Sequence, residues 1–348
     1  MSIILSNHMR ICQYRHILMP VLCLFCLTSC NDDTDIVCDY PQEQLLTAKT
    51  ADTPSELYKA YAISVFNGKY VFSKKGDYFL TIIDSTFIGH YELLRKGHGE
   101  NEWMAPMLTG QHVTIDGKEL VCILERSNGV LYASDVEDSI THKRILLADL
   151  NKKGIPDARN AFIIHNGKIV GQRDSKNCEW FICNDTEAKA SFINSGIDDK
   201  LFQYNPQILS QGLIAYHEAS KTFIQTFFAY PLLCFLDEDC NIKKKIQLCN
   251  RMPAYNEKTA VEPFNYIVDI FPSDKYIYVL FDSLERETKN KMHILVFDWD
   301  ANPVAKLQID RSLAFAVDEK KSIIISINED DEKGCCSIYY YNSTFGSK

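Results

Sequence analysis

The chain has 348 residues, with 37 Lys and Arg against 46 Asp and Glu, and carries a formal net charge of −9 at pH 7. This acidic excess opposes nucleic acid and anionic lipid headgroups as electrostatic partners, so we expect neither as a ligand. A chain of this length forms either one large all-β domain or two smaller domains.

The first 29 residues predict a secretory signal peptide. Arg10 and Arg15 precede an apolar stretch over residues 17–27, which runs into the sequence LTSC at 27–30. A basic start, a short apolar run and small residues before a cleavage point are typical of such a signal. The run is too short to cross a bilayer, which needs about 20 residues. Met9 would open this signal more directly than Met1 does, and the choice of initiator between the two stays open.

The sequence LTSC resembles the lipobox of bacterial lipoproteins, in which cleavage leaves the cysteine first and acyl chains are added to its thiol and amine. The resemblance implies lipidation of Cys30 and attachment to a membrane through palmitate-type chains, each buried CH₂ contributing about 0.8 kcal/mol. Residues 30–42 would then form an acidic tether. Removal of residues 1–29 leaves 35 basic and 46 acidic residues, a formal charge of −11.

Two interpretations of the acidic residues after Cys30 stay open. Asp32 and Asp33 resemble the export tag that carries lipoproteins of Bacteroidota-type bacteria to the cell surface, and Asn31 stands where an inner-membrane retention signal has Asp. The alternative is a solvated tether without a sorting role. We therefore expect a chain anchored in the outer membrane, either exposed at the cell surface or facing the periplasm.

Short segments rich in Val, Ile, Tyr and Phe recur between Gly, Asn and Asp turns after the tether, as is typical of β-strands. An apolar strand that runs into a polar turn appears six times, with a spacing near 50 residues. Six copies with this period predict an all-β, six-bladed β-propeller with four antiparallel strands per blade over residues 43–342, followed by a tail at 343–348. The six strands end at Asp84, Asp135, Asp185, Asp237, Asp298 and Asn342.

A second turn pattern predicts where the first strand of each blade meets the second. Asn-Gly and Asp-Gly tolerate the positive φ of a tight hairpin. These turns and those between third and fourth strands share one face of the ring, the hairpin face; loops between second and third strands share the other, the crossover face. The predicted hairpins are 67–69, 116–118, 166–168, 210–212, 273–275 and 318–320, and the predicted crossover-face loops are 74–77, 125–128, 173–177, 217–221, 282–291 and 328–333.

The last repeat ends too early to supply a fourth strand. After Tyr341 only the sequence NSTFGSK remains. An open strand edge invites aggregation, so the ring needs a strand from elsewhere. We predict that an N-terminal strand over residues 44–49 completes the last blade.

The sequence GHGENEW, residues 97–103, follows the fourth strand of blade one and precedes the first strand of blade two. A phosphate-binding glycine loop would open a helix within a βαβ unit, whereas this one leads into another strand. We interpret it as a structural crossover between blades. Its glycines let the chain bend, and Glu102 accepts hydrogen bonds from backbone amides.

So placed, RKGHGENEW resembles the G-x-G-P-x-E-[FY] signature of TolB-like six-bladed propeller lipoproteins of Bacteroides-type organisms. Gly97, Gly99, Glu102 and Trp103 match its glycines, acid and aromatic residue. Residue 100 is Glu where the family often has Pro, and residue 101 is Asn where it often has Gly. The resemblance implies the fold and an envelope lipoprotein, and it implies no activity.

Metal and catalytic sites find little support in the sequence. His98, Glu100, Glu102 and His112 are close in sequence, but alternate residues of an extended loop point in opposite directions and cannot all meet at one metal ion. No G-x-S-x-G, HExxH or Ser-x-x-Lys context appears where a site would form. Nine cysteines follow Cys30 without a diagnostic spacing, so disulfide pairing stays open. We expect neither a metal nor a cofactor, and assign no catalytic residues.

These observations predict a binding or scaffold propeller of the cell envelope, without enzyme activity, that recognises a protein or a glycan through its crossover face. One alternative is a hydrolase or lyase acting on glycans, which would need carboxylates that converge in the channel mouth. A second alternative is a structural subunit of an envelope complex. The candidate binding residues are Arg95, His98, Glu100, Glu102 and Trp103 on the crossover, with Arg126, Arg173 and His217 on neighbouring loops.

Overall fold

The computed structural model describes residues 34–342, and nearly all of them belong to one compact unit, Asp35–Lys348. The predicted signal peptide, the lipidation site Cys30, Asp32 and Asp33, and the tail therefore lie outside the described residues. No helix in the described part is long and apolar enough to cross a membrane. The segments left undescribed within this range are 52–53, 55–56, 58, 100, 138–143, 175–178, 185–189, 194–198, 284–289 and 331–334.

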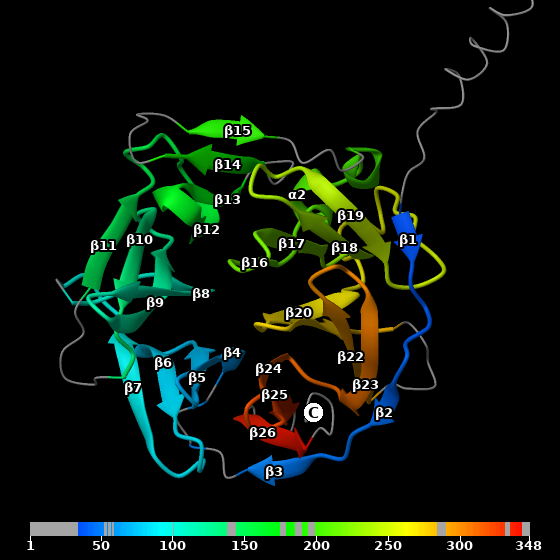
Figure 1. Cartoon of the computed structure of the whole chain (residues 1–348), viewed down its shortest axis with the longest axis horizontal. Helices are drawn as coiled ribbons and strands as arrows, with labels where there is room; N and C mark the ends of the chain where they lie inside the picture. The colour runs from blue at the N-terminus through cyan, green and yellow to red at the C-terminus, as the bar shows by residue number, and fades with distance from the viewer. Residues whose placement is uncertain are drawn as a thin grey trace, which may run out of the picture. The chain divides into compact units, whose positions relative to one another are not determined.

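Six sheets, each built on antiparallel strands, stand around a common centre, which confirms the predicted six-bladed propeller (Figure 1). In each of the first three blades, four consecutive strands pair in sequence order. Blade one is β4 (Ala60–Phe66), β5 (Lys69–Lys74), β6 (Tyr78–Ile83) and β7 (His90–Arg95); blade two is β8 (Pro106–Ile115), β9 (Lys118–Glu125), β10 (Val130–Ser134) and β11 (Arg144–Asp149); blade three is β12 (Ala158–Ile163), β13 (Ile169–Arg173), β14 (Trp180–Cys183) and β15 (Ser191–Ile193).

The second half of the ring repeats this arrangement. Two short helices, η3 (Asp199–Phe202) and α2 (Pro206–Leu209), connect blades three and four, and η2 (His165–Gly167) forms the hairpin of blade three. Blade four is β16 (Ile214–His217), β17 (Thr222–Phe227), β18 (Tyr230–Leu236) and β19 (Ile242–Gln247); blade five is β20 (Ile267–Pro272), β21 (Tyr276–Phe281), β22 (Lys291–Asp298) and β23 (Pro303–Asp310); blade six begins with β24 (Ala314–Asp318), β25 (Ile323–Asp330) and β26 (Cys335–Asn342).

The middle strands of the blades are buried on both faces because each sheet packs between two neighbours. Every residue of β17 and of β18 is buried, for example. Strands in this position read as continuous apolar runs, and the alternation of apolar and polar residues is lost. The recurring apolar runs that set the period of the sequence are the third strands of the blades, such as β18.

The N-terminal segment closes the ring with three short strands. β3 (Lys49–Ala51) pairs antiparallel with β26 and supplies the fourth strand of blade six. β2 (Glu43–Leu45) adds a parallel fifth strand to blade five, and β1 (Thr34–Ile36) lies beside β19 of blade four. The predicted closure by an N-terminal strand is confirmed.

The range predicted for that strand, 44–49, needs correction. Gln44 and Leu45 belong to blade five, and the strand that completes blade six begins at Lys49. The turn between them is made by residues 46–48, with Leu46 buried. Within the range 30–42 assigned to the tether, Thr34–Ile36 form β1 beside β19, and the Val37 N–H donates to the Gln247 carbonyl at 2.9 Å.

Blade four departs from the predicted turn assignment. The hairpin between its first and second strands is residues 218–221, and the predicted hairpin at 210–212 precedes β16. The predicted crossover-face loop 217–221 is therefore wrong and lies on the hairpin face. Gly212 misled the prediction because it serves a close backbone approach: a Cβ there would overlap the carbonyl oxygen of Thr226.

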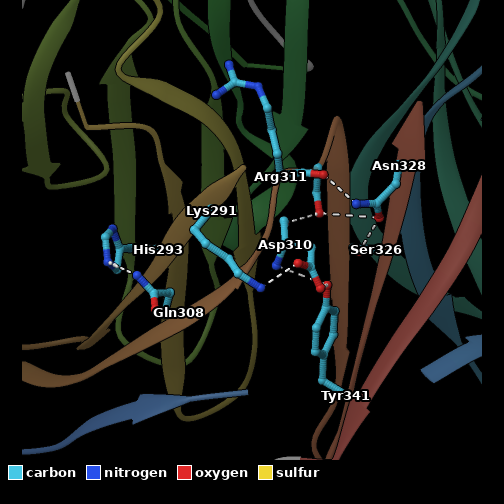
Figure 2. A network of polar contacts seen from close by, with 9 residues as sticks. Lys291, His293, Gln308, Asp310, Arg311, Ser326, Asn328 and Tyr341 are labelled. Carbon is cyan, nitrogen blue, oxygen red and sulfur yellow. Dashed lines mark hydrogen bonds and ion pairs between the residues drawn. The ribbon is translucent and has the colours of Figure 1, made fainter. Parts of the chain in front are cut away.

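Polar contacts hold the crossover from blade five to blade six (Figure 2). The Lys291 ammonium pairs with Asp310 at 2.5 Å, and the backbone N–H of Asp310 donates to the Tyr341 hydroxyl at 3.2 Å. The side-chain amide of Asn328, buried beside them, donates to the Arg311 carbonyl and accepts from Ser326 at 2.9 Å. These bonds replace the backbone ladder that the chain loses where it leaves β23.

The Asp269 carboxylate joins the first strands of blades five and six. It accepts hydrogen bonds from the backbone N–H groups of Ile270 at 2.9 Å and Phe315 at 3.1 Å. Burial raises the pKa of Asp269 to about 7, since the loss of hydration outweighs these two bonds. Between about pH 4 and pH 7 the native state thus retains a proton that the unfolded chain, with a pKa of 3.8, has released.

Replacement of Asp269 by Asn is expected to remove a pH dependence of stability. Between about pH 4 and pH 7 the wild-type native state binds more protons than the unfolded state, so its free energy of unfolding falls as pH rises, by at most about 1.4 kcal/mol per pH unit. The variant lacks this contribution. Urea unfolding of both proteins at several pH values measures it, and a difference between them that stays constant with pH would refute the assignment.

Candidate binding site

A cavity of about 890 Å³ opens on the hairpin face, and we call it the hairpin-face cavity. Five of the six blades line it, so it lies where the blades converge. Blades one, four, five and six contribute the ends of their first strands and the turns that follow, and blade two contributes residues within β8 and Glu119 of β9. Its lining residues are Val65, Asn67, Gly68, Gly110, Gln111, His112, Glu119, Tyr216, His217, Glu218, Ala219, Phe271, Pro272, Ser273, Asp274, Lys275, Val317, Asp318, Glu319 and Lys320.

An irregularity in β8 places the residues of blade two. The register between β8 and β9 shifts between Leu108 and His112, and Gly110 has a φ of 78°, which glycine adopts without strain. The Gln111 side chain, beyond this bulge, bridges to blade three: it accepts from the Ile163 N–H at 2.9 Å and donates to the Ile163 carbonyl. His112 Nδ1 lies 3.4 Å from Glu119 Oε1.

His217 is fixed at the end of β16 by contacts on two sides. Its ring stacks on Trp299 with centroids 4.2 Å apart and planes 9° apart. His217 Nδ1 lies 2.8 Å from Ser220 Oγ and accepts from the Ser220 N–H at 3.3 Å. Because Nδ1 accepts, the neutral ring carries its proton on Nε2. Trp299 lies in the turn after β22 and donates from Nε1 to the Ser273 carbonyl of the same blade at 3.0 Å, so the ring stack joins blade four to two turns of blade five.

Glu319 connects the hairpins of blades five and six. Its Oε1 accepts hydrogen bonds from Ser273 Oγ at 2.6 Å and from the Tyr278 hydroxyl at 2.8 Å. Asp318 is buried beside it and pairs with Lys321 at 3.0 Å. Glu319 is therefore held in a fixed position at the cavity, as a group that binds a ligand must be.

The cavity is acidic, and its imidazoles are neutral. Five carboxylates line it, against the ammonium groups of Lys275 and Lys320. Burial lowers the pKa of His112, and the nearby charge of Glu119 opposes the shift only in part. Burial also lowers the pKa of His217, against the charge of Asp274. At neutral pH each ring offers one N–H donor and one acceptor nitrogen.

A metal centre finds no support in the described part of the chain. No group of three or more His, Cys, Asp or Glu side chains is arranged there to hold a metal ion. Of the cluster considered in the sequence, His112 lies in the hairpin-face cavity and His98 and Glu102 on the crossover, while Glu100 lies outside the described residues. The topology thus separates residues that the sequence places close together.

Contacts within the crossover GHGENEW and with the adjacent strands hold it in place. The Glu102 carboxylate accepts from the Gly99 N–H at 2.9 Å, as expected, and lies 3.7 Å from the exposed Arg95 guanidinium. Trp103 is 1 % exposed, and the Arg144 guanidinium covers its ring at 4.2 Å. His98 is exposed beside them. Glu102 and Trp103 are thus occupied by contacts within the protein, which agrees with the structural interpretation.

The remaining candidate residues do not form one site. Arg126 is exposed in the turn after β9, and Arg173 pairs with Glu179 at 3.3 Å and lies over the Phe192 ring at 4.9 Å. Both lie on the crossover face. His217 lies on the opposite face, because residues 218–221 are the hairpin of blade four. The prediction that it shares a face with the two arginines is wrong.

Sequence reasoning missed most of the hairpin-face cavity. The turns at 67–69, 273–275 and 318–320 were correctly placed on one face, but their short, similar form suggested no recognition role. The charges within them, Asp274, Lys275, Glu319 and Lys320, were the available signal. Because six turns at one end of a propeller surround its axis, charged residues within them converge there.

Comparisons with known proteins support the fold alone. No protein-family model matches the sequence, and no curated protein matches it. A solved protein of Bacteroides fragilis NCTC 9343, inferred to be exported, is 10% identical over 86% of this chain and 98% of that one, with a TM-score of 0.53.

Two other solved structures are similar at lower TM-scores. A member of the DUF4221 family from Bacteroides vulgatus is 10% identical over 85% of this chain and 97% of that one, with a TM-score of 0.49. A calcium-binding regucalcin from Agrobacterium tumefaciens is 11% identical over 87% and 97%, with a TM-score of 0.48. At 10% identity, the protein of Bacteroides fragilis supports the propeller fold of this chain and does not test the TolB-like resemblance of the crossover.

Proposed function

We propose that this chain is a binding protein of the bacterial cell envelope, anchored through a lipid on Cys30, that holds a glycan in the hairpin-face cavity. The observation that carries the proposal is the lining of that cavity. Carboxylates, neutral imidazoles and the side-chain amides of Asn67 and Gln111 surround a concave space, with the apolar surfaces of Tyr216 and Phe271 among them.

A saccharide fits this chemistry. Its hydroxyl groups donate to carboxylate oxygens and accept from N–H groups, and its C–H faces pack on aromatic rings. No opposite charge is needed, so the acidic excess of the cavity does not oppose binding. Concave sites of about 300–1,000 Å³ with a few fixed polar groups are the usual form of small-ligand sites. A flat protein partner would contact the rim of such a cavity and leave its polar interior unpaired.

The test is a glycan array of plant, animal and bacterial oligosaccharides, followed by calorimetry of the strongest ligand. Combined replacement of His217 by Ala and Glu319 by Gln is expected to weaken binding about tenfold or more, since two half-buried hydrogen-bonding groups, one of them charged, are lost. The control replaces Arg126 and Arg173 by Gln and should leave affinity unchanged. Circular dichroism confirms that both variants fold.

Other outcomes separate the alternatives. Loss of binding in the arginine control would move recognition to the crossover face and overturn the assignment of the cavity. Failure of every oligosaccharide to bind would reject the glycan and favour a structural subunit. A glycan hydrolase or lyase remains a second candidate because Glu119, Glu218, Asp274, Asp318 and Glu319 gather in one cavity. Mass spectrometry of bound oligosaccharides after incubation would reveal cleavage.

A further inference from the structure

A second cavity, of about 700 Å³, lies under the N-terminal segment on its way from blade four to blade five. Cys38 and Tyr40 cover it from the stretch between β1 and β2. The chain that leaves β19 and residues from all four strands or strand ends of blade five provide the rest of its wall. We call it the strap cavity. It shares no lining residue with the hairpin-face cavity and does not depend on the proposed glycan site.

The strap cavity is basic in an acidic chain. Arg251 and Lys306 line it together with His293, and the described residues of its lining include no carboxylate. Lys306 reaches Glu43 at 3.8 Å, a long pair with an acid whose side chain is 58% exposed. Exposed pairs of this kind contribute about 0–1 kcal/mol, so a ligand anion can replace this one at little cost. Arg251 forms no ion pair within the described part of the chain.

Its other walls are apolar and aromatic. Leu248, Tyr266, Phe281 and Leu295 line it, and the Tyr40 ring packs edge-on against Phe297 with centroids 5.9 Å apart. The Tyr40 hydroxyl is buried and has no hydrogen-bond partner in the described structure. A hydroxyl that is closed off from solvent is also closed off from the water-accessible space, so Tyr40 contributes its ring to the wall of the cavity.

His293 adds a third polar group on the blade-five side. Figure 2 shows its ring beside Gln308, with His293 Nε2 3.4 Å from the amide nitrogen. At 9% exposure the imidazole is set into the wall of the cavity. Together, two cations and an imidazole line a space whose remaining surface suits rings or branched chains.

We propose that the strap cavity binds an amphipathic organic anion, a carboxylate or phosphate monoester joined to an aromatic or branched aliphatic body. Arg251 and Lys306 hold the anionic oxygens, and the rings of Tyr40, Tyr266 and Phe281 contact the body. Because Tyr40 belongs to the N-terminal segment, the ligand also joins this segment to blades four and five. Ligand binding to the native state therefore raises the unfolding temperature.

Calorimetry on the full chain with 2-naphthoate and 2-naphthamide tests the proposal, because the two probes share a body and differ in charge. We expect naphthoate to bind about tenfold or more tightly than the amide. Combined Arg251→Gln and Lys306→Gln should abolish this preference and the thermal shift caused by naphthoate. Arg126→Gln, an exposed arginine away from the cavity, serves as the matched control.

Three results would overturn the proposal: equal affinity for the two probes, naphthoate binding that survives the double substitution, or no saturable binding of naphthoate in the millimolar range. Replacement of His217 and Glu319 should leave naphthoate binding unchanged. A failure of the strap cavity is thereby distinguished from a failure of the hairpin-face cavity.

Discussion

Replacement of Leu46 by Asp is expected to lower the free energy of unfolding by about 3–5 kcal/mol. Leu46 is 3% exposed and packs in the apolar cluster between blades five and six, with Leu307, Phe315 and Tyr341 among its members. Its N–H donates to the Gln308 carbonyl at 2.9 Å, so the backbone cannot move away easily. The substitution removes the burial of an apolar side chain and places a carboxylate in its position.

The neighbouring residue provides a matched control. Leu45 is 65% exposed, and Leu45→Asp is expected to change stability by no more than about 0.5 kcal/mol. Chemical denaturation followed by tryptophan fluorescence measures both variants. The Leu46 variant should also aggregate more readily, because release of the N-terminal segment exposes the edges of β23 and β26. Equal stability of the two variants would show that this segment does not close the ring.

Gly212→Ala is expected to destabilise the protein by about 3 kcal/mol or more, as overpacking against backbone does. A Cβ at this position would overlap the Thr226 carbonyl and lie 2.9 Å from the Cα of Phe227. Both obstacles are backbone, and Thr226 Oγ1 further fixes the approach by accepting from the Leu213 N–H at 3.0 Å. Relief would require β16 to separate from β17, which would also displace His217.

Gly154→Ala separates this steric effect from the loss of glycine itself. Gly154 has a φ of 76° and open space around its Cα, so alanine there meets only the strain of the left-handed conformation, about 1 kcal/mol. Thermal unfolding of the two variants should show the larger decrease for Gly212→Ala. If both decrease equally, the close approach of the two strands is not a constraint on the fold.

The propeller could be predicted because its period is a local property of the chain. A third strand buried between two blades must be apolar along its length, and the turn after it must be polar, so each blade repeats the pattern ending at Asp84 or Asp298. The turn residues then fix the phase of each blade. Where one residue serves a different purpose, as Gly212 does, the phase of blade four is assigned incorrectly.

The binding surfaces depend on contacts that no local pattern records. His112 and His217 are 105 positions apart and line the same cavity, because the ring brings the first strands of blades two and four to its centre. Cys38 and Arg251 share the strap cavity because the N-terminal segment crosses blades four and five on its way to blade six. The sequence by itself determined the number of blades and the need for a closing strand, since both the period of the apolar strands and the number of strands can be counted along the chain. Only the tertiary structure decided which charged residues converge, because convergence is set by ring closure between segments distant in sequence.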